Sequence, residues 1–217
     1  MKQSIKPALF ALLVLALAFV STLAQQTSSP VTASTTQTSP VNLDFERGTA
    51  GQVPAGWVSP TRERGYAAET IDKMPRTGTK AAVLRSESDA VIDPRSFGNL
   101  MQAVDAAPFR GRRVRLRGAA RVEAGEAGGA RAQLWMRVDR ADEKLGFFDN
   151  MGDRPITSGE WQFYEIVGDV EADAKTLNFG MIFYGRGKAY LDDVSVEDLG
   201  KTVLAAQPPR PMTKRCL

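Results

Sequence analysis

The stretch that alternates most regularly along the chain is Arg113-Val114-Arg115-Leu116-Arg117-Gly118-Ala119-Ala120-Arg121-Val122. Its even-numbered positions are apolar or small, and arginine occupies most of the odd-numbered positions. Successive side chains of a β-strand point to opposite faces, so a period of two predicts one buried face and one solvent-facing side. Residues 113–122 therefore predict a half-buried strand whose outer face is rich in arginine.

The same alternation recurs in residues 133–139 and 177–184, and turn-forming glycines separate these segments. Shorter strand candidates are residues 42–46, 81–86, 99–105, 161–167 and 189–197. No sustained helical pattern is visible between residues 42 and 199, so helix is expected only as a turn or two, with residues 96–102 as a candidate. Eight or more short strands with turns between them predict an all-β sandwich or barrel.

Composition limits the chemistry that the chain can perform. The 217 residues include 43% hydrophobic and 24% charged residues, enough for one sizeable core, and the formal net charge is +3. The chain contains no histidine and one cysteine, Cys216. Ser-His and Cys-His nucleophile pairs, histidine-ligated zinc and an intrachain disulfide are thus excluded.

The two ends differ in composition from the middle of the chain. Residues 1–24 combine Lys2 and Lys6 with an apolar run and small residues, which predicts a secretory signal peptide; an uncleaved N-terminal anchor is the alternative. Residues 25–41 form a Ser/Thr/Gln/Pro-rich linker, and residues 200–217 a basic, proline-containing tail. We expect an exported protein, periplasmic or extracellular, with its folded domain at residues 42–199.

Short motifs at both ends of this domain resemble a known family. Residues 42–46 spell Asn-Leu-Asp-Phe-Glu, residues 54–57 spell Pro-Ala-Gly-Trp, and residues 190–195 spell Tyr-Leu-Asp-Asp-Val-Ser. They resemble the carbohydrate-binding modules that are also called galactose-binding-like domains. The resemblance implies a two-sheet antiparallel jelly-roll β-sandwich. A second set of motifs, in residues 134–139, 148–151 and 154–156, is similar to a subgroup found in bacterial exported and regulatory proteins.

The resemblance also implies a structural calcium ion. Its ligands would be Glu46, one of Asp192 and Asp193, and a carbonyl near Lys80, since calcium prefers hard oxygen ligands. The alternative is that these acids are solvated or paired with arginine.

A ligand face is expected on residues 133–139. Trp135, Arg137 and Asp139 point the same way from one strand, and together they supply an aromatic platform, a donor fork and an acceptor. The predicted ligand-binding residues are Trp135, Arg137, Asp139, Asp149, Asn150 and Tyr184. The alternative is that Trp135 belongs to the core, where we also expect Trp57 and Trp161.

The arginines of residues 110–121 are a third candidate. Their spacing suits an anionic ligand, but we favour the alternative that these arginines face solvent and pair with acids across the sheet. The sequence thus predicts a non-catalytic binding module whose partner is carbohydrate, with no nucleic acid and no membrane contact beyond the signal segment. The alternatives are an envelope protein-protein assembly module and a small polysaccharide lyase or hydrolase.

Overall fold

The computed structural model describes residues 36–60, 65–87, 92–126 and 128–201, all within the compact unit Ser34–Leu217. The predicted signal peptide lies outside these residues, as do most of the linker and nearly all of the tail. In the described part of the chain, no helix has the length and apolar character that spanning a membrane requires.

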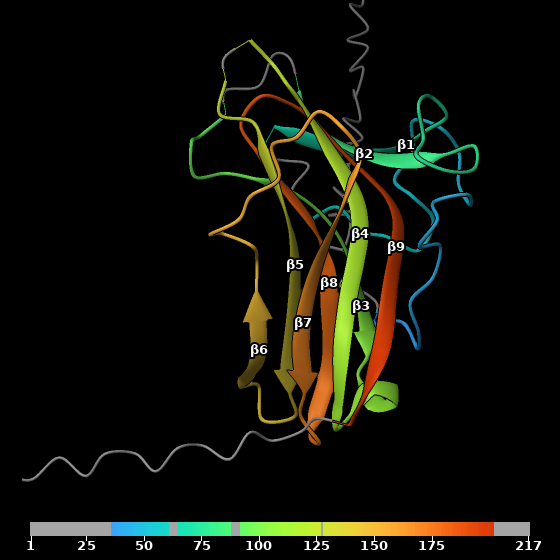
Figure 1. Ribbon diagram of the computed structural model, residues 1–217, viewed down its shortest axis with the longest axis vertical. Coiled ribbons are helices and arrows are strands. Elements are labelled where there is room, and N and C mark those ends of the chain that lie inside the picture. Colours follow the sequence, from blue (N-terminus) through green and yellow to red (C-terminus); the bar gives the residue numbers. More distant parts are fainter. Residues whose placement is uncertain (1–35, 61–64, 88–91, 127, 202–217) are drawn as a thin grey trace, which may run out of the picture. The chain divides into compact units, whose positions relative to one another are not determined.

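The described residues form nine strands and one 3₁₀ turn, η2 (Ala107–Phe109). The strands are β1 (Tyr66–Ile71), β2 (Ala81–Ser86), β3 (Gly98–Asp105), β4 (Arg112–Ala124), β5 (Arg131–Arg140), β6 (Leu145–Asp149), β7 (Gln162–Val170), β8 (Ala174–Tyr184) and β9 (Gly187–Lys201). They build a five-stranded sheet in the order β1-β2-β9-β4-β7 and a four-stranded sheet in the order β3-β8-β5-β6 (Figure 1). Every pairing between these strands is antiparallel, as the predicted jelly-roll sandwich requires.

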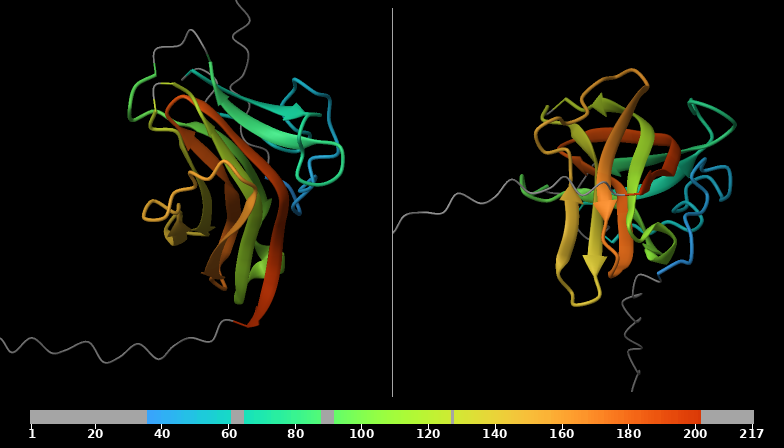
Figure 2. Two further views of the ribbon diagram at one scale, coloured as in Figure 1. Left: turned by 45° about the horizontal axis from the view of Figure 1, so that its top comes forward. Right: turned by 60° about the horizontal axis from the view of Figure 1, so that its bottom comes forward.

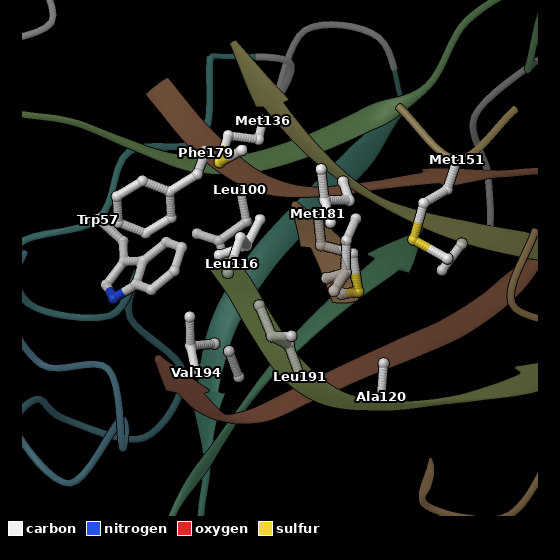
Figure 3. Close-up of a cluster of buried hydrophobic side chains, with 14 of the residues drawn as sticks. Trp57, Leu100, Leu116, Ala120, Met136, Met151, Phe179, Met181, Leu191 and Val194 are labelled. Carbon is white, nitrogen blue, oxygen red and sulfur yellow. The ribbon is translucent and has the colours of Figure 1, made fainter. Parts of the chain in front are cut away.

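Strand β4 confirms the prediction made from its alternating apolar and arginine side chains. Val114 and Leu116 are buried, and the arginines on either side of them, Arg113, Arg115 and Arg117, lie on the outer face of the five-stranded sheet. In the other sheet, Leu134 and Met136 of β5 point into the same core as Phe179 and Met181 of β8. Figure 3 shows Leu116, Met136, Phe179 and Met181 among the side chains packed between strands of both sheets, and Figure 2 shows the sheets from two further sides.

The segment before β1 is held by the side chain of Asn42. Its Nδ2 donates to the carbonyl oxygens of Arg47 and Ala55, both at 2.9 Å, and its Oδ1 accepts from the Arg47 amide at 2.8 Å. The Asn42 carbonyl accepts from the Trp57 indole at 3.0 Å. Trp57 then stacks on Phe45, with 5.0 Å between ring centroids, and meets Phe179 edge-on at 5.9 Å. The motif residues 42–46 and 54–57 thus hold each other in place through hydrogen bonds and ring contacts. Trp57 lies in the core, as predicted.

Several sequence-based expectations about local structure were wrong. Residues 42–46 are not a strand, because Asn42 and Phe45 have φ angles of 50° and 57° and the chain turns there. Residues 96–102 are not helical either; residues 98–105 form β3, which buries Leu100 and Val104. Strands β1 and β6 had not been expected.

Trp161 is not in the core, where the sequence predicted it. It lies outside the buried core, just before β7, and its ring packs against Tyr190 with 6.3 Å between centroids.

The chain contacts the sandwich already before residue 42, where the folded domain was expected to begin. The amide of Gln37 donates to the carbonyl of Ala103 on β3, at 2.8 Å.

Replacing Asn42 should destabilise the whole domain. Asn42→Ala removes three hydrogen bonds of a buried side chain and leaves the Arg47 amide and the Ala55 carbonyl without their Asn42 partner, so we expect a loss of about 2–4 kcal/mol in the free energy of unfolding. Urea denaturation measures this change. Arg47→Ala is the matched control, because the Asn42 contacts use only the Arg47 backbone. Equal urea midpoints for the two variants would contradict this role of Asn42.

Candidate functional site

The outer face of the four-stranded sheet carries the predicted row on β5. Ala132, Leu134, Met136 and Val138 belong to the core, so the residues between them point away from it. Directly opposed residues share a face, which adds outward side chains from the neighbouring strands. We call this surface the Trp135 face, and its members used below are Phe97, Asn99, Arg131, Gln133, Trp135, Arg137, Asp139, Leu145, Phe148, Thr176, Asn178, Gly180 and Tyr184.

Trp135 lies on this face and not in the core. It sits opposite Gly180 of β8, and its indole Nε1 donates to Oδ1 of Asn99 on β3 at 3.0 Å. Because Gly180 has no side chain, the indole can cross β8 to reach β3. Only 8% of the Trp135 surface is exposed, so the ring is held in a fixed orientation by its surroundings. Trp135 is therefore buried, as the alternative to an exposed platform expected, although it lies on the outer side of β5 and outside the cluster between the two sheets.

Arg137 and Asp139 form a polar network beside the indole. The Arg137 guanidinium donates to Oδ2 of Asp139 at 2.9 Å, and the same oxygen accepts from Nδ2 of Asn178 at 2.8 Å. The Thr176 hydroxyl lies 3.3 Å from it. The Arg137 side chain remains 45% exposed and that of Asp139 31% exposed, so the pair offers donors and an acceptor to solvent.

Tyr184 lies on the Trp135 face, at the end of β8. It is opposite Arg131, whose guanidinium carbon is 4.3 Å from the Tyr184 ring centroid. The ring of Phe97 approaches from the other side, with centroids 5.5 Å apart. Four of the six predicted ligand residues, namely Trp135, Arg137, Asp139 and Tyr184, thus share one face.

The structure does not bring Asp149 to this face. Asp149 is opposite Met136, whose side chain is in the core, so the Asp149 side chain lies on the inner side of β6. Burial raises the pKa of Asp149, but the Arg154 guanidinium and the Met151 amide lower it, and the net shift is downward. Asn150 follows in the next loop, where its Oδ1 accepts from the amide of Gly152 at 3.2 Å.

Two buried asparagines of the Trp135 face that contact predicted ligand residues were not themselves predicted. Asn99 and Asn178 position Trp135 and Asp139, and each is buried. Gln133 is 5% exposed, and its Oε1 has no hydrogen-bond partner. The strand period places Asn178 on one face of β8, but which residues of β5 and β3 lie opposite depends on register, which the sequence does not show.

The predicted calcium ligands contact protein donors. Both oxygens of the Glu46 carboxylate are engaged: Oε1 accepts from the amides of Thr79 and Lys80, at 2.8 and 3.0 Å, and Oε2 accepts from the Thr79 hydroxyl at 2.6 Å. The bond from the Thr79 hydroxyl, with these two amides, lowers the pKa of Glu46. Asp192 is fully buried, and its Oδ2 accepts from the amides of Arg76 and Thr77.

Asp193 is paired with the side chains of the same loop, the Arg76 guanidinium and the Thr77 hydroxyl. Burial raises the pKa of Asp192, and the loop amides counter part of that effect. Within the described residues, no group of three or more Asp, Glu, His or Cys side chains is placed to hold a metal. The carboxylates of Glu46, Asp192 and Asp193 each accept hydrogen bonds from protein groups, and the calcium site stays a prediction of the resemblance alone.

The arginines of β4 divide into two groups. Arg112, Arg113 and Arg115 pair across the sheet with Asp198, Asp169 and Glu197, respectively. These ion pairs agree with the alternative prediction from the sequence, in which the arginines pair with acids across the sheet and do not form an anion-binding site. Farther along the strand, Arg117 stacks on Phe163 at 3.4 Å and Arg121 on Tyr190 at 3.9 Å. Aromatic rings therefore occupy the guanidinium planes that a ligand would otherwise use.

The lowered pKa of Glu46 makes its contribution to stability dependent on pH. A carboxyl whose pKa is lower in the folded state stabilises the fold above its ordinary value, here 4.5, and loses that effect as the pH falls through the folded pKa. We expect Glu46→Gln to be less stable than the wild type at about pH 7 and to approach it at about pH 3. Urea midpoints across this range measure the difference. Asp44→Asn, an exposed neighbour, is the control, and a wild-type advantage that does not shrink with falling pH would refute the role of the Glu46 charge.

Comparison with known proteins gives one curated relative and many solved structures. No protein-family model matches the chain. The uncharacterized HTH-type transcriptional regulator YbfP of Bacillus subtilis is 35% identical over 118 residues, which cover 54% of this chain and 39% of that regulator. The chain thus matches less than half the length of this relative.

Three solved structures with the same fold are family 22 carbohydrate-binding modules. The CBM22-1 xylan-binding domain of Paenibacillus barcinonensis Xyn10C gives a TM-score of 0.51 at 14% identity, covering 77% of this chain and 100% of that domain. The CBM22-1-CBM22-2 tandem of the same protein gives 0.53 at 12% identity, covering 82% and 50%. The C-terminal family 22 module of Clostridium thermocellum Xyn10B gives 0.51 at 12% identity, covering 74% and 92%. The chain therefore has the jelly-roll β-sandwich fold that these carbohydrate-binding modules share.

Proposed function

We propose that this chain is an exported, non-catalytic module that binds carbohydrate on the Trp135 face. The observation that carries the proposal is the convergence of Trp135, Arg137, Asp139 and Tyr184 on one outward sheet surface. Sugars present flat C–H faces to aromatic rings and hydroxyl groups to paired donors and acceptors. The fold shared with xylan-binding modules supports the same conclusion.

Each side chain would have a distinct task. The indole of Trp135 is 8% exposed and fixed by Asn99, so it forms the base of the surface and offers a ligand only a small apolar contact, at little entropic cost. The exposed Arg137–Asp139 pair supplies N–H donors and a carboxylate oxygen to sugar hydroxyls. Tyr184 extends the surface along β8, so that a ligand of several sugar units would contact more than one aromatic ring.

The carboxylates support a binding role over a catalytic one. A general acid in glycoside hydrolysis needs a raised pKa, whereas the pKa of Asp149 is lowered. Asp139 is engaged by Arg137 and Asn178, and it lies on the opposite side of the sheet from Asp149. Export rests on the composition of residues 1–24 alone.

A protein partner is the second candidate, and one observation favours it. Leu145 and Phe148 of the edge strand β6 are 56% and 50% exposed and flank the Arg137–Asp139 pair on the same face. Exposed apolar side chains that adjoin polar ones are common at protein-protein contacts. This surface also suits assembly with another envelope protein.

Removing the central indole should weaken carbohydrate binding. We expect Trp135→Ala to weaken binding about tenfold or more on a panel of immobilised neutral and acidic polysaccharides, because the central aromatic contact is lost. Isothermal titration with the best binder from the panel measures the change. Circular dichroism checks that the variant remains folded.

Two further variants make this test specific. Trp161→Ala removes an indole from the other sheet and should leave binding unchanged. Tyr184→Ala should weaken binding without touching the Trp135–Asn99 hydrogen bond. Failure of the wild-type protein to bind any polysaccharide of the panel, or equal losses for the Trp135 and Trp161 variants, would refute the proposal.

A further inference from the structure

The three acids that suggested a metal site all contact one loop, residues 76–80 between β1 and β2. Its sequence is Arg-Thr-Gly-Thr-Lys, and it donates hydrogen bonds to Glu46, Asp192 and Asp193. Glu46 belongs to the segment before β1, and the two aspartates belong to β9. The loop therefore joins the N-terminal segment to the five-stranded sheet.

Lys80 completes this junction with a positive charge. Its Nζ donates to the carbonyl oxygens of Glu46, at 3.1 Å, and Gly48, at 2.9 Å. The same charge also favours ionised Glu46, whose carboxylate accepts from the Lys80 amide. Two carbonyls and a nearby carboxylate are the surroundings that a bound cation requires, and here the ammonium group lies against them.

We propose that the Lys80 ammonium is the built-in cation of this junction and that the domain needs no divalent metal ion to hold residues 42–57 in place. The engaged carboxylates support this proposal. The Glu46 oxygens and both oxygens of Asp192 already accept hydrogen bonds from protein groups, so a metal would have to displace them. A metal cation would also meet the positive charge of Lys80 at close range.

The shape of the loop is adapted to the carboxylate of Glu46. Gly78 has a φ of +62°, and a Cβ atom built there would lie 2.2 Å from Glu46 Oε1. Only glycine fits at this position without displacing the carboxylate from the Thr79 and Lys80 amides. The loop thus forms a fixed set of donors for Glu46.

The junction also bears on the Trp135 face, although the proposal does not depend on carbohydrate binding. Residues 42–57 carry Trp57 into the core, and Val58 then exchanges two backbone hydrogen bonds with Met101 of β3, both at 2.9 Å. Strand β3 supplies Asn99, the partner of the Trp135 indole. Greater mobility of residues 42–57 would therefore also affect β3 and Asn99, at one edge of the Trp135 face.

Thermal melts of the full chain test the proposal directly. The wild-type melting temperature should be the same in excess EDTA and in millimolar calcium chloride. Lys80→Met keeps most of the aliphatic stem but removes the charge and the donors, and it should lower the melting temperature by roughly 3–10 °C. Hydrogen exchange should rise in residues 42–57 of this variant.

Matched variants separate this role from a general effect of lysine removal. Lys144→Met removes an exposed lysine that pairs with Asp142 and should leave the melting temperature nearly unchanged. Lys80→Arg retains the charge and should melt closer to the wild type than Lys80→Met does. A wild-type melting temperature that falls in EDTA, or a Lys80→Met melt equal to that of the wild type, would overturn the proposal.

Discussion

The face that a β5 side chain occupies is decided by the packing of its neighbours. Leu134, Met136 and Val138 fill the space between the sheets, and a strand has only two sides, so Trp135, Arg137 and Asp139 must face outward. A shift of one residue in the β5–β8 register would bury an arginine and an aspartate and expose the core. The candidate site is thus a direct consequence of how the core is built.

A second constraint acts at the N-terminal side of the sandwich. Hydrogen bonds from Asn42 and from the loop of residues 76–80 hold a segment that has no strand of its own within residues 42–57. Carboxylates that resemble metal ligands in the sequence instead accept hydrogen bonds from amides, hydroxyls and the arginine of that loop. Charge, backbone geometry and aromatic packing all fasten the same stretch of chain.

The parts that could be predicted are those where local pattern and tertiary packing agree. The alternation in residues 113–122 and 177–184 predicts β4 and β8, because each has one buried face. Residues 42–46 also carry spaced apolar side chains, yet hydrogen bonds from Asn42 to residues farther along the chain favour a turn there. Strand β6, at Leu145–Asp149, shows no alternation, and its pairing with β5 shifts register between Arg137 and Asp139. The side to which Asp149 points therefore depends on long-range pairing that no local pattern encodes.

The N-terminal segment also makes backbone hydrogen bonds to the two outermost strands β1 and β3. Gln37 and Val58 occupy the edge of β3, and Gly51 and Gln52 bond to Thr70 on β1. Exposed strand edges are where chains add to one another and aggregate. One margin of each sheet is thus partly covered by the protein's own backbone, which leaves fewer free strand groups there for edge-to-edge association between molecules.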